Sequence, residues 1–526
     1  MSGMFDSKQD KANKKLIRTK QEEKAKKKTR IITISIITAL LIFSATAIII
    51  NSGFIRRTAP AVSVDGVNFS AAEFEFFFNN EYMEYVNFMS QFQGMGAMPE
   101  QGIPLSKQIY YVDPESGEVT TWAEFMTASA FERMAGLAAL YNAAVSAGFK
   151  LSDEQIQSID DEIAMLELQA LFSGFPNTNT MLQQMFGTGM NEKAYRNIME
   201  FIATANSYNE HVRESFTYTS DELAGYYAEN KDDLDVFTYR QFTVFIDHPN
   251  SEDFDDDEYD TALEEATEAA RLEAETLERQ ITGEDDFNTT AANYNEVYSD
   301  PDSTIRLAQG NRLDFNIADW LLDPTRKYGD TTITETDHGF NIILFVLRDD
   351  NNYRTVGMRQ ILILREQVSP DDFTLGTDDP GYIEALNRAE TEATQRADEV
   401  LSLFLAAGET EDALIGLMAE HSDDTTEGGY YPDIAKFTYQ SSHVQAMKVV
   451  PEIEDWLFDE NRQIGDSHMV HTSAFGYHLL YFTGFGDIFF EIMAEDRMRT
   501  RDHTSWLETL EIHQPVKRAG FIFVHV

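Results

Sequence analysis

The most constraining feature of the sequence is a segment that occurs twice. Residues 317–330 align without a gap on residues 453–466, and eight of the fourteen positions are identical. Each copy keeps one of the four Trp residues of the chain, Trp320 and Trp456. Because internal self-similarity of this kind marks a repeated unit, the chain is expected to contain two copies of one fold.

Charge divides the chain into a basic start and an acidic remainder. Residues 1–30 hold 11 Lys and Arg against 4 Asp and Glu, whereas the whole chain has a net charge of -49. Residues 31–50 carry no charge and are rich in Ile and Leu. These twenty residues are about the length of a membrane-spanning helix. With its basic flank N-terminal, this pattern predicts a cytoplasmic tail over 1–30 and a transmembrane signal anchor over 31–52.

A cleaved signal peptide is the alternative reading of the same segment. Its apolar region is normally about 7–15 residues, which is shorter than the segment here. We therefore expect a single-pass protein of the cell membrane, held there by residues 31–52, with its N-terminus cytoplasmic and most of the chain extracytoplasmic. An extracellular and a periplasmic location fit this pattern equally well.

The composition excludes several kinds of chemistry. The chain has no Cys, so disulfides, thiolate nucleophiles and Cys-based metal sites are ruled out. The acidic balance of the chain argues against nucleic acid as a partner. The acidic run over 252–260 lacks the spacing and central Gly of an EF-hand, so it predicts a solvated loop. We expect neither a metal nor a cofactor.

Residues 58–232 have the apolar spacing of a helical domain with one small strand pair at its start. Ser70 is a predicted helix N-cap, with Glu73 at the capping-box position. Met and Phe cluster in this region, and Met suits surfaces that accept many apolar partners.

Each copy of the repeated segment lies in the same order of predicted elements: a strand, helices, the Trp segment and a closing strand. Arg240-Gln241 matches Arg359-Gln360 at the openings of the two copies. Such an order predicts a small α+β module in each case. The predicted boundaries are 237–349 for the first module, 353–486 for the second, and 487–526 for a C-terminal helix and strand, the strand over 520–526.

The second module carries a more specific pattern. Residues 421–429 read His-Ser-Asp-Asp-Thr-Thr-Glu-Gly-Gly, residues 450–458 read Val-Pro-Glu-Ile-Glu-Asp-Trp-Leu-Phe, and residues 475–478 read Phe-Gly-Tyr-His. This pattern resembles the parvulin-type (PpiC-like) peptidyl-prolyl isomerases. The wider layout resembles the SurA- and PrsA-like foldases, in which parvulin modules accompany a helical chaperone domain.

The resemblance implies an α+β protein with four parts. They are an N-terminal transmembrane helix, a helical SurA-like chaperone domain, two tandem degenerate parvulin-like modules, and a C-terminal helix and strand that pack back on the first domain. It also implies a site in which a polar network faces an apolar slot for a proline ring.

Carried over residue by residue, the resemblance places this site in the second module. The catalytic network falls on Asp424, Thr472 and His478, with Gln360 where the family has a second histidine. The substrate-binding residues fall on Tyr431, Val449, Ile453 and Phe475. In the first module Gln241 and Asn341 occupy both histidine positions, which indicates an inactive copy.

The predicted function is a membrane-anchored extracytoplasmic folding factor that binds unfolded or proline-containing exported polypeptides. The resemblance adds weak peptidyl-prolyl cis-trans isomerase activity in the second module. Rotation about the amide bond must overcome roughly 18–20 kcal/mol but needs no nucleophile and no metal. Two alternatives stay open, a pure holdase chaperone and a structural envelope docking protein with inactive modules. The oligomeric state is not predicted.

Overall fold

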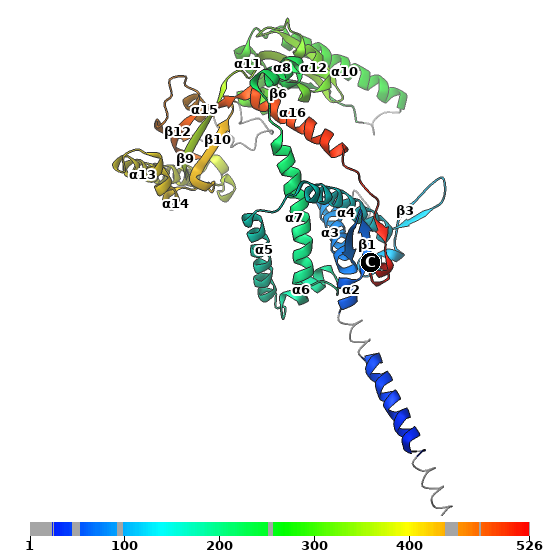
Figure 1. The fold of residues 1–526 in the computed structure, drawn as a ribbon. Coiled ribbons are helices and arrows are strands. Elements are labelled where there is room, and N and C mark those ends of the chain that lie inside the picture. Colours follow the sequence, from blue (N-terminus) through cyan, green and yellow to red (C-terminus); the bar gives the residue numbers. More distant parts are fainter. Residues whose placement is uncertain are drawn as a thin grey trace, which may run out of the picture. The chain divides into compact units, whose positions relative to one another are not determined.

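The computed structural model describes residues 24, 26–44, 53–91, 98–250, 256–436, 451–472 and 475–524. The chain is a mixed α+β protein built of helices and small sheets (Figure 1). It divides into two compact units. Unit 1 comprises residues 1–216 and 501–526, and unit 2 comprises residues 217–500.

Unit 1 is mainly helical. Its helices are α2 (Phe54–Thr58), α3 (Ala71–Gln91), α4 (Trp122–Ala147), α5 (Asp153–Phe172), α6 (Thr178–Phe186) and α7 (Glu192–Ser215). Its strands are β1 (Pro60–Val64), β2 (Val67–Ser70), β3 (Ile109–Val112), β4 (Val119–Thr121) and β13 (Val516–Lys517). The predicted cap of α3 is confirmed: the Ser70 and Glu73 side chains each accept a hydrogen bond from the other's backbone N–H.

The end of the chain completes the core of unit 1. Strand β13 pairs antiparallel with β1, which places three strands in the order β13-β1-β2. The strand expected over 520–526 is wrong, because residues 519–523 form a 3-10 turn. A Cβ on Gly520 would lie 2.5 Å from the carbonyl oxygen of Pro60, so the backbone there packs too closely for another residue.

The expected transmembrane helix over residues 31–52 is not found. No helix in the described part of the chain combines the length and the apolar character that crossing a membrane requires. Residues 26–44 are helical, but the apolar stretch within them, 31–44, is shorter than the roughly 20 residues of a span. Residues 45–52 of the predicted segment lie outside the described residues.

Unit 2 holds the duplicated elements and the helices beside them. The first copy contains β5 (Val236–Phe245), α10 (Asp256–Glu278), α11 (Glu284–Tyr294), β6 (Ile305–Gln309), α12 (Phe315–Leu322), β7 (Thr331–Thr336) and β8 (Gly339–Asp349). The second contains β9 (Arg354–Leu364), α13 (Pro380–Ala406), α14 (Glu411–His421), β10 (Tyr430–Ile434), α15 (Pro451–Leu457), β11 (Ser467–Thr472) and β12 (Gly476–Ile488). The flanking helices are α8 (Ser220–Glu229), α9 (Lys231–Leu234) and α16 (Phe489–Glu508), of which the residues from 501 on belong to unit 1.

The two copies form sheets of the same topology. One sheet has the order β6-β5-β8-β7 and the other β10-β9-β12-β11, with every neighbouring pair antiparallel. The repeated Trp segment also has the same contacts in both. Arg326 and Arg462 each lie 4.1 Å from the ring centroid of their Trp, and each donates Nε to that Trp's carbonyl oxygen, at 3.1 and 3.0 Å.

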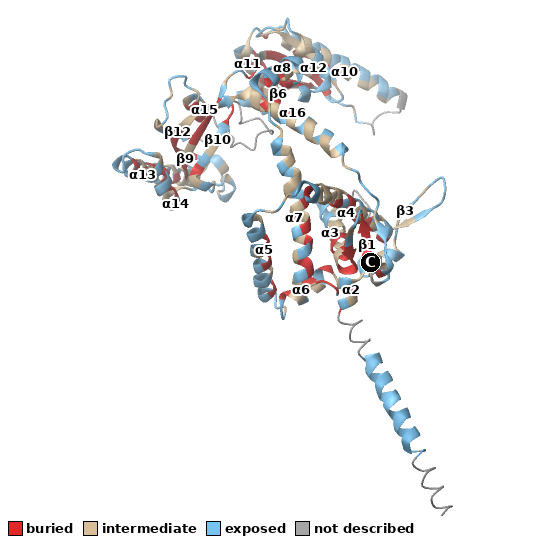
Figure 2. Cartoon of the chain, viewed as in Figure 1, coloured by how far each residue is buried: buried red, intermediate tan, exposed pale blue. Residues whose placement is uncertain are grey.

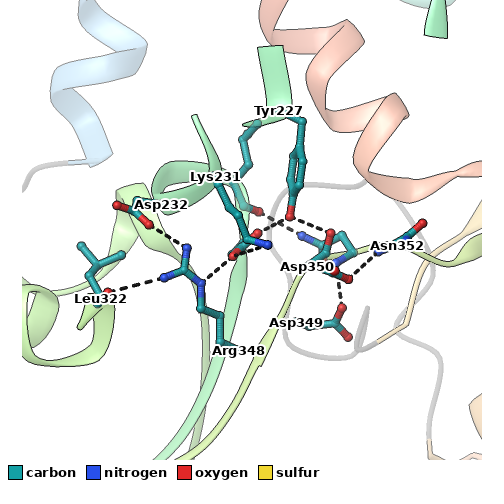
Figure 3. A network of polar contacts seen from close by, with 11 residues as sticks. Tyr227, Lys231, Asp232, Leu322, Arg348, Asp349, Asp350 and Asn352 are labelled. Atoms are coloured by element: carbon teal, nitrogen blue, oxygen red, sulfur yellow. Dashed lines mark hydrogen bonds and ion pairs between the residues drawn. The ribbon is translucent and has the colours of Figure 1, made fainter. Parts of the chain in front are cut away.

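A buried carboxylate ties the two ends of the first module together. Asp235 has no exposed surface and accepts a hydrogen bond from Nε of Arg348 at 2.5 Å. Arg348 also binds Asp232 at 2.7 Å, and the Tyr227 hydroxyl contacts both Asp235 and the carbonyl oxygen of Asp350 (Figure 3). The carboxylate therefore joins α8, the start of β5 and the end of β8 at one point.

Candidate active site

The candidate site lies on the sheet of the second module. One face of this sheet packs on α13 and α14 through a core that includes Ile361, Phe404 and Leu479. The opposite face packs on α15 through a second core. Gln360 on β9 and His478 on β12 lie on this opposite face, since His478 pairs with Leu362, two residues beyond Gln360.

Four predicted site residues form one hydrogen-bonded chain. His478 Nδ1 lies 3.0 Å from Gln360 Oε1, and His478 Nε2 lies 3.1 Å from Thr472 Oγ1. Gln360 Nε2 donates to Asp424 Oδ2 at 2.7 Å. His478, Gln360 and Thr472 are each only 2% exposed. The two sheet strands and the hairpin partner β11 therefore hold these groups beneath the surface.

Asp424 is the charged residue at one end of this hydrogen-bonded series. It follows α14, and besides Gln360 it accepts the Thr426 backbone N–H at 2.9 Å and the Tyr431 hydroxyl at 2.7 Å. Burial alone would raise the pKa of Asp424, but these hydrogen bonds outweigh it and hold the pKa below its usual value. Asp424 is therefore ionised at neutral pH.

His478 is neutral at the same pH. Burial lowers its pKa to about 4, although the negative charge of Asp424 acts in the opposite direction. An imidazole with both ring nitrogens in hydrogen bonds and no charge is fixed in position. These side chains therefore form a preset polar network beneath the surface, and Asp424 and Tyr431 lie at its more exposed end.

The predicted substrate-binding residues are not all at the surface. Tyr431, on the edge strand β10, is half-buried, and its hydroxyl also lies 2.6 Å from Thr426 Oγ1. Phe475 is 40% exposed, and its ring meets His478 edge-on with centroids 6.2 Å apart. Ile453 has no exposed surface and packs in the core beneath α15, so it supports the site from within. Val449 lies outside the described residues.

Sequence reasoning missed Thr426, which binds both Asp424 and Tyr431. The signal was available in the spacing Asp424-x-Thr426, because an Asp side chain commonly accepts the N–H two residues on.

Among the residues of the first module that the structure describes, this network is absent. Pro301 follows Ser299-Asp300 where Asp424 follows Ser422-Asp423, so no carboxylate is present at that position. Asn341, which matches His478, accepts a hydrogen bond from Thr243 at 2.7 Å. The sheet topology is shared between the modules, whereas Pro301 and Asn341 of the first module replace Asp424 and His478 of the second.

Comparisons with known proteins give little to set beside this site. No protein-family model matches the chain, and no curated protein matches it. Among solved structures, PrsA from Bacillus subtilis matches with a TM-score of 0.14 and 13% sequence identity, over 55% of this chain and 93% of that one.

Proposed function

We propose that this chain is an extracytoplasmic folding factor whose second module isomerises Xaa-Pro bonds weakly. The observation that supports the proposal most is the network Asp424–Gln360–His478–Thr472, which assembles from three separate parts of the module. Its clients would be unfolded exported polypeptides that contain proline.

The network suits a reaction that needs binding rather than bond breaking. A twisted amide loses resonance, so an enzyme accelerates rotation by binding that state better than the planar one. Phe475 offers an exposed apolar ring, and Tyr431 and Asp424 offer polar groups at the edge of the same site. His478 and Thr472 lie beneath them and hold them in place, which is consistent with modest acceleration.

The test is NMR exchange spectroscopy on short Xaa-Pro peptides with the full-length protein. We expect acceleration that His478→Ala abolishes and that Asn341→Ala, the matched change in the first module, leaves intact. Circular dichroism confirms that each variant is folded. No acceleration by the folded protein would refute the isomerase, and equal loss in both variants would remove the site from the second module.

A second candidate function, a holdase, is favoured by a different observation. Helix α5 in unit 1 exposes several large apolar side chains, with Phe172 84% exposed and Leu171 70% exposed. Exposed apolar patches are typical of surfaces that bind other proteins. Suppression of the aggregation of an unfolded test protein, retained in His478→Ala, is the expected result. Failure to suppress aggregation would refute this candidate.

The proposed extracytoplasmic location rests on the charge asymmetry between residues 1–30 and the acidic remainder. Digestion of intact cells or spheroplasts by an added protease tests it. We expect residues 58–526 to be degraded without lysis, and protection of this region until lysis would refute the location.

A further inference from the structure

Helix α5 has two apolar faces, and only one of them is covered. Ile159, Ile163 and Ala170 are buried against the rest of unit 1, where α5 packs on α6 and α7. The opposite side is exposed (Figure 2). It carries large apolar side chains at helical spacing, namely Met165 at 65%, Leu168 at 49%, Leu171 at 70% and Phe172 at 84% exposure.

The exposed side of α5 is acidic in its N-terminal half. Glu154, Asp161 and Leu168 are seven residues apart, so they lie nearly above one another along α5. The helix contains six Asp and Glu and neither Lys nor Arg. Asp160 is paired with Arg196, but within the described ranges no cation is paired with Glu154 or Asp161. Along this row the surface is therefore divided into a carboxylate half, Glu154 and Asp161, and an apolar half, Leu168 and Phe172, whereas the exposed side chains of Ile156 and Glu167 lie to one side of it.

This division restricts what can cover the face. A second copy packed antiparallel in register would set carboxylates against apolar side chains. A parallel copy would set carboxylates against carboxylates, and like charges at close range are repulsive. An anionic membrane surface is disfavoured for the same reason. The complementary occupant is a segment of another protein with apolar side chains at one end and Lys or Arg at the other.

We propose that the outer face of α5 is a docking surface for a cationic amphipathic segment of a partner polypeptide. Its large apolar side chains would pack on Met165, Leu168 and Phe172, and its basic groups would meet Glu154 and Asp161. The centres of the two halves are about 16 Å apart at 1.5 Å of rise per residue. This surface lies in unit 1, so the proposal is independent of the isomerase site, but it rests on the same exposed side chains of α5 as the holdase candidate.

The test uses the full-length protein and two labelled peptides of about 20 residues, enough for a helix as long as α5. One peptide carries Leu and Phe in one half and Lys in the other, and the second peptide replaces every Lys with Glu. Fluorescence anisotropy measures the dissociation constants. We expect the Lys peptide to bind about tenfold more tightly at low salt, with most of this preference lost at about 1 M salt.

Variants then assign the binding to α5. Leu168→Gln with Phe172→Gln should weaken binding of the Lys peptide by about tenfold or more, because both side chains are apolar anchors. Glu154→Gln with Asp161→Asn should remove the preference for the Lys peptide. The matched control, Leu272→Gln with Leu405→Gln, alters side chains that are each 50% exposed on other helices, and it should leave binding unchanged.

Three results would overturn the proposal. They are equal binding of both peptides, unchanged binding in the α5 apolar variant, and equal weakening by the control. Sedimentation supplies a further contradicting outcome, a dimer that the α5 apolar variant abolishes, because the occupant would then be a second copy. Circular dichroism shows that each variant is folded, so loss of binding cannot come from unfolding.

Discussion

Gln360 lies between a carboxylate and an imidazole. Its hydrogen bonds to both fix the orientation of its own amide group and of the imidazole. An ionised Asp424 can only accept hydrogen bonds, so the amide nitrogen of Gln360 must face it. The amide oxygen then faces His478, which requires the imidazole proton on Nδ1. Nε2 is left as an acceptor for the hydroxyl of Thr472.

We predict that Asp424→Asn releases this orientation. An Asn side chain can present either its oxygen or its amide group, so Gln360 can turn over and His478 becomes a mixture of tautomers. Long-range nitrogen–proton NMR correlations of the imidazole measure the tautomer directly. Asp423→Asn, which alters the adjacent carboxylate, is the control and should leave the Nδ1–H form. An unchanged tautomer in Asp424→Asn would show that Asp424 does not set it.

His478 also predicts a pH dependence of stability. The unfolded histidine takes up a proton near pH 6.5, whereas burial lowers the pKa of the folded one to about 4. Its contribution is therefore fully present above pH 6.5 and is lost as the pH falls toward 4, by about 1.4 kcal/mol per pH unit.

Urea unfolding at several pH values measures this loss. His478→Gln should flatten the decline between pH 6.5 and 4, and His468→Gln, a change of an exposed histidine, should not. Parallel profiles for the native protein and His478→Gln would contradict the assignment.

At the scale of elements, the duplicated arginines predict equal effects in the two modules. Arg326 and Arg462 each stack on a Trp and bind that Trp's carbonyl oxygen with nearly the same distances. We expect Arg326→Met and Arg462→Met each to lower the free energy of unfolding by about 1–2 kcal/mol.

Urea titration followed by tryptophan fluorescence measures both. Arg279→Met is the control, since that side chain is 73% exposed and its ion pair with Glu275 should contribute little. Clearly unequal losses of unfolding free energy in the two arginine variants would contradict this prediction, because the two sites would then have similar geometry but different contributions to stability.

The helices and central strands were predictable, and the edge strands were not. The helical domain expected over 58–232 contains helices α3 to α7, and the strand, helices, Trp segment and closing strand expected in each module occur in that order. Strands β6, β7, β10 and β11 were missed, because an edge strand depends on its neighbour more than on its own apolar pattern. Strand β10 also contains Pro432, which its edge position and the register shift between Tyr431 and Ile434 accommodate.

The site was predictable to the extent that it depends on sheet register. Gln360 and His478 meet because β9 and β12 are neighbours, which the order of elements implied. The position of Ile453 could not be read from the sequence, since an apolar residue on α15 can face either the core or a ligand. Only packing shows that it faces the core.

At the scale of the whole molecule, residues 516–524 stabilise unit 1. The Phe521 ring lies 5.3 Å from Phe74 between ring centroids, and Lys517 Nζ lies 4.5 Å from the same ring of Phe521. We predict that Phe521→Ala lowers the stability of unit 1 by about 2 kcal/mol and leaves unit 2 unchanged.

Amide hydrogen exchange measures the stability of each unit separately in one experiment. Amides of β1 and β2 should exchange faster in Phe521→Ala, while those of β9 and β12 should keep their rates. Ile522→Ala is the control, because that neighbouring side chain is 78% exposed. Faster exchange in both units would contradict a local role for Phe521.

In each module, the residue at which the chain enters is paired with the residue at which it leaves. Val236 pairs with Asp349 in the first module, and Arg354 pairs with Ile488 in the second. A segment whose ends are neighbours can be cut out and the gap closed by a few residues without threading the chain through a core. A gene that encodes such a segment could gain or lose a whole module in one recombination event and still encode modules whose ends meet.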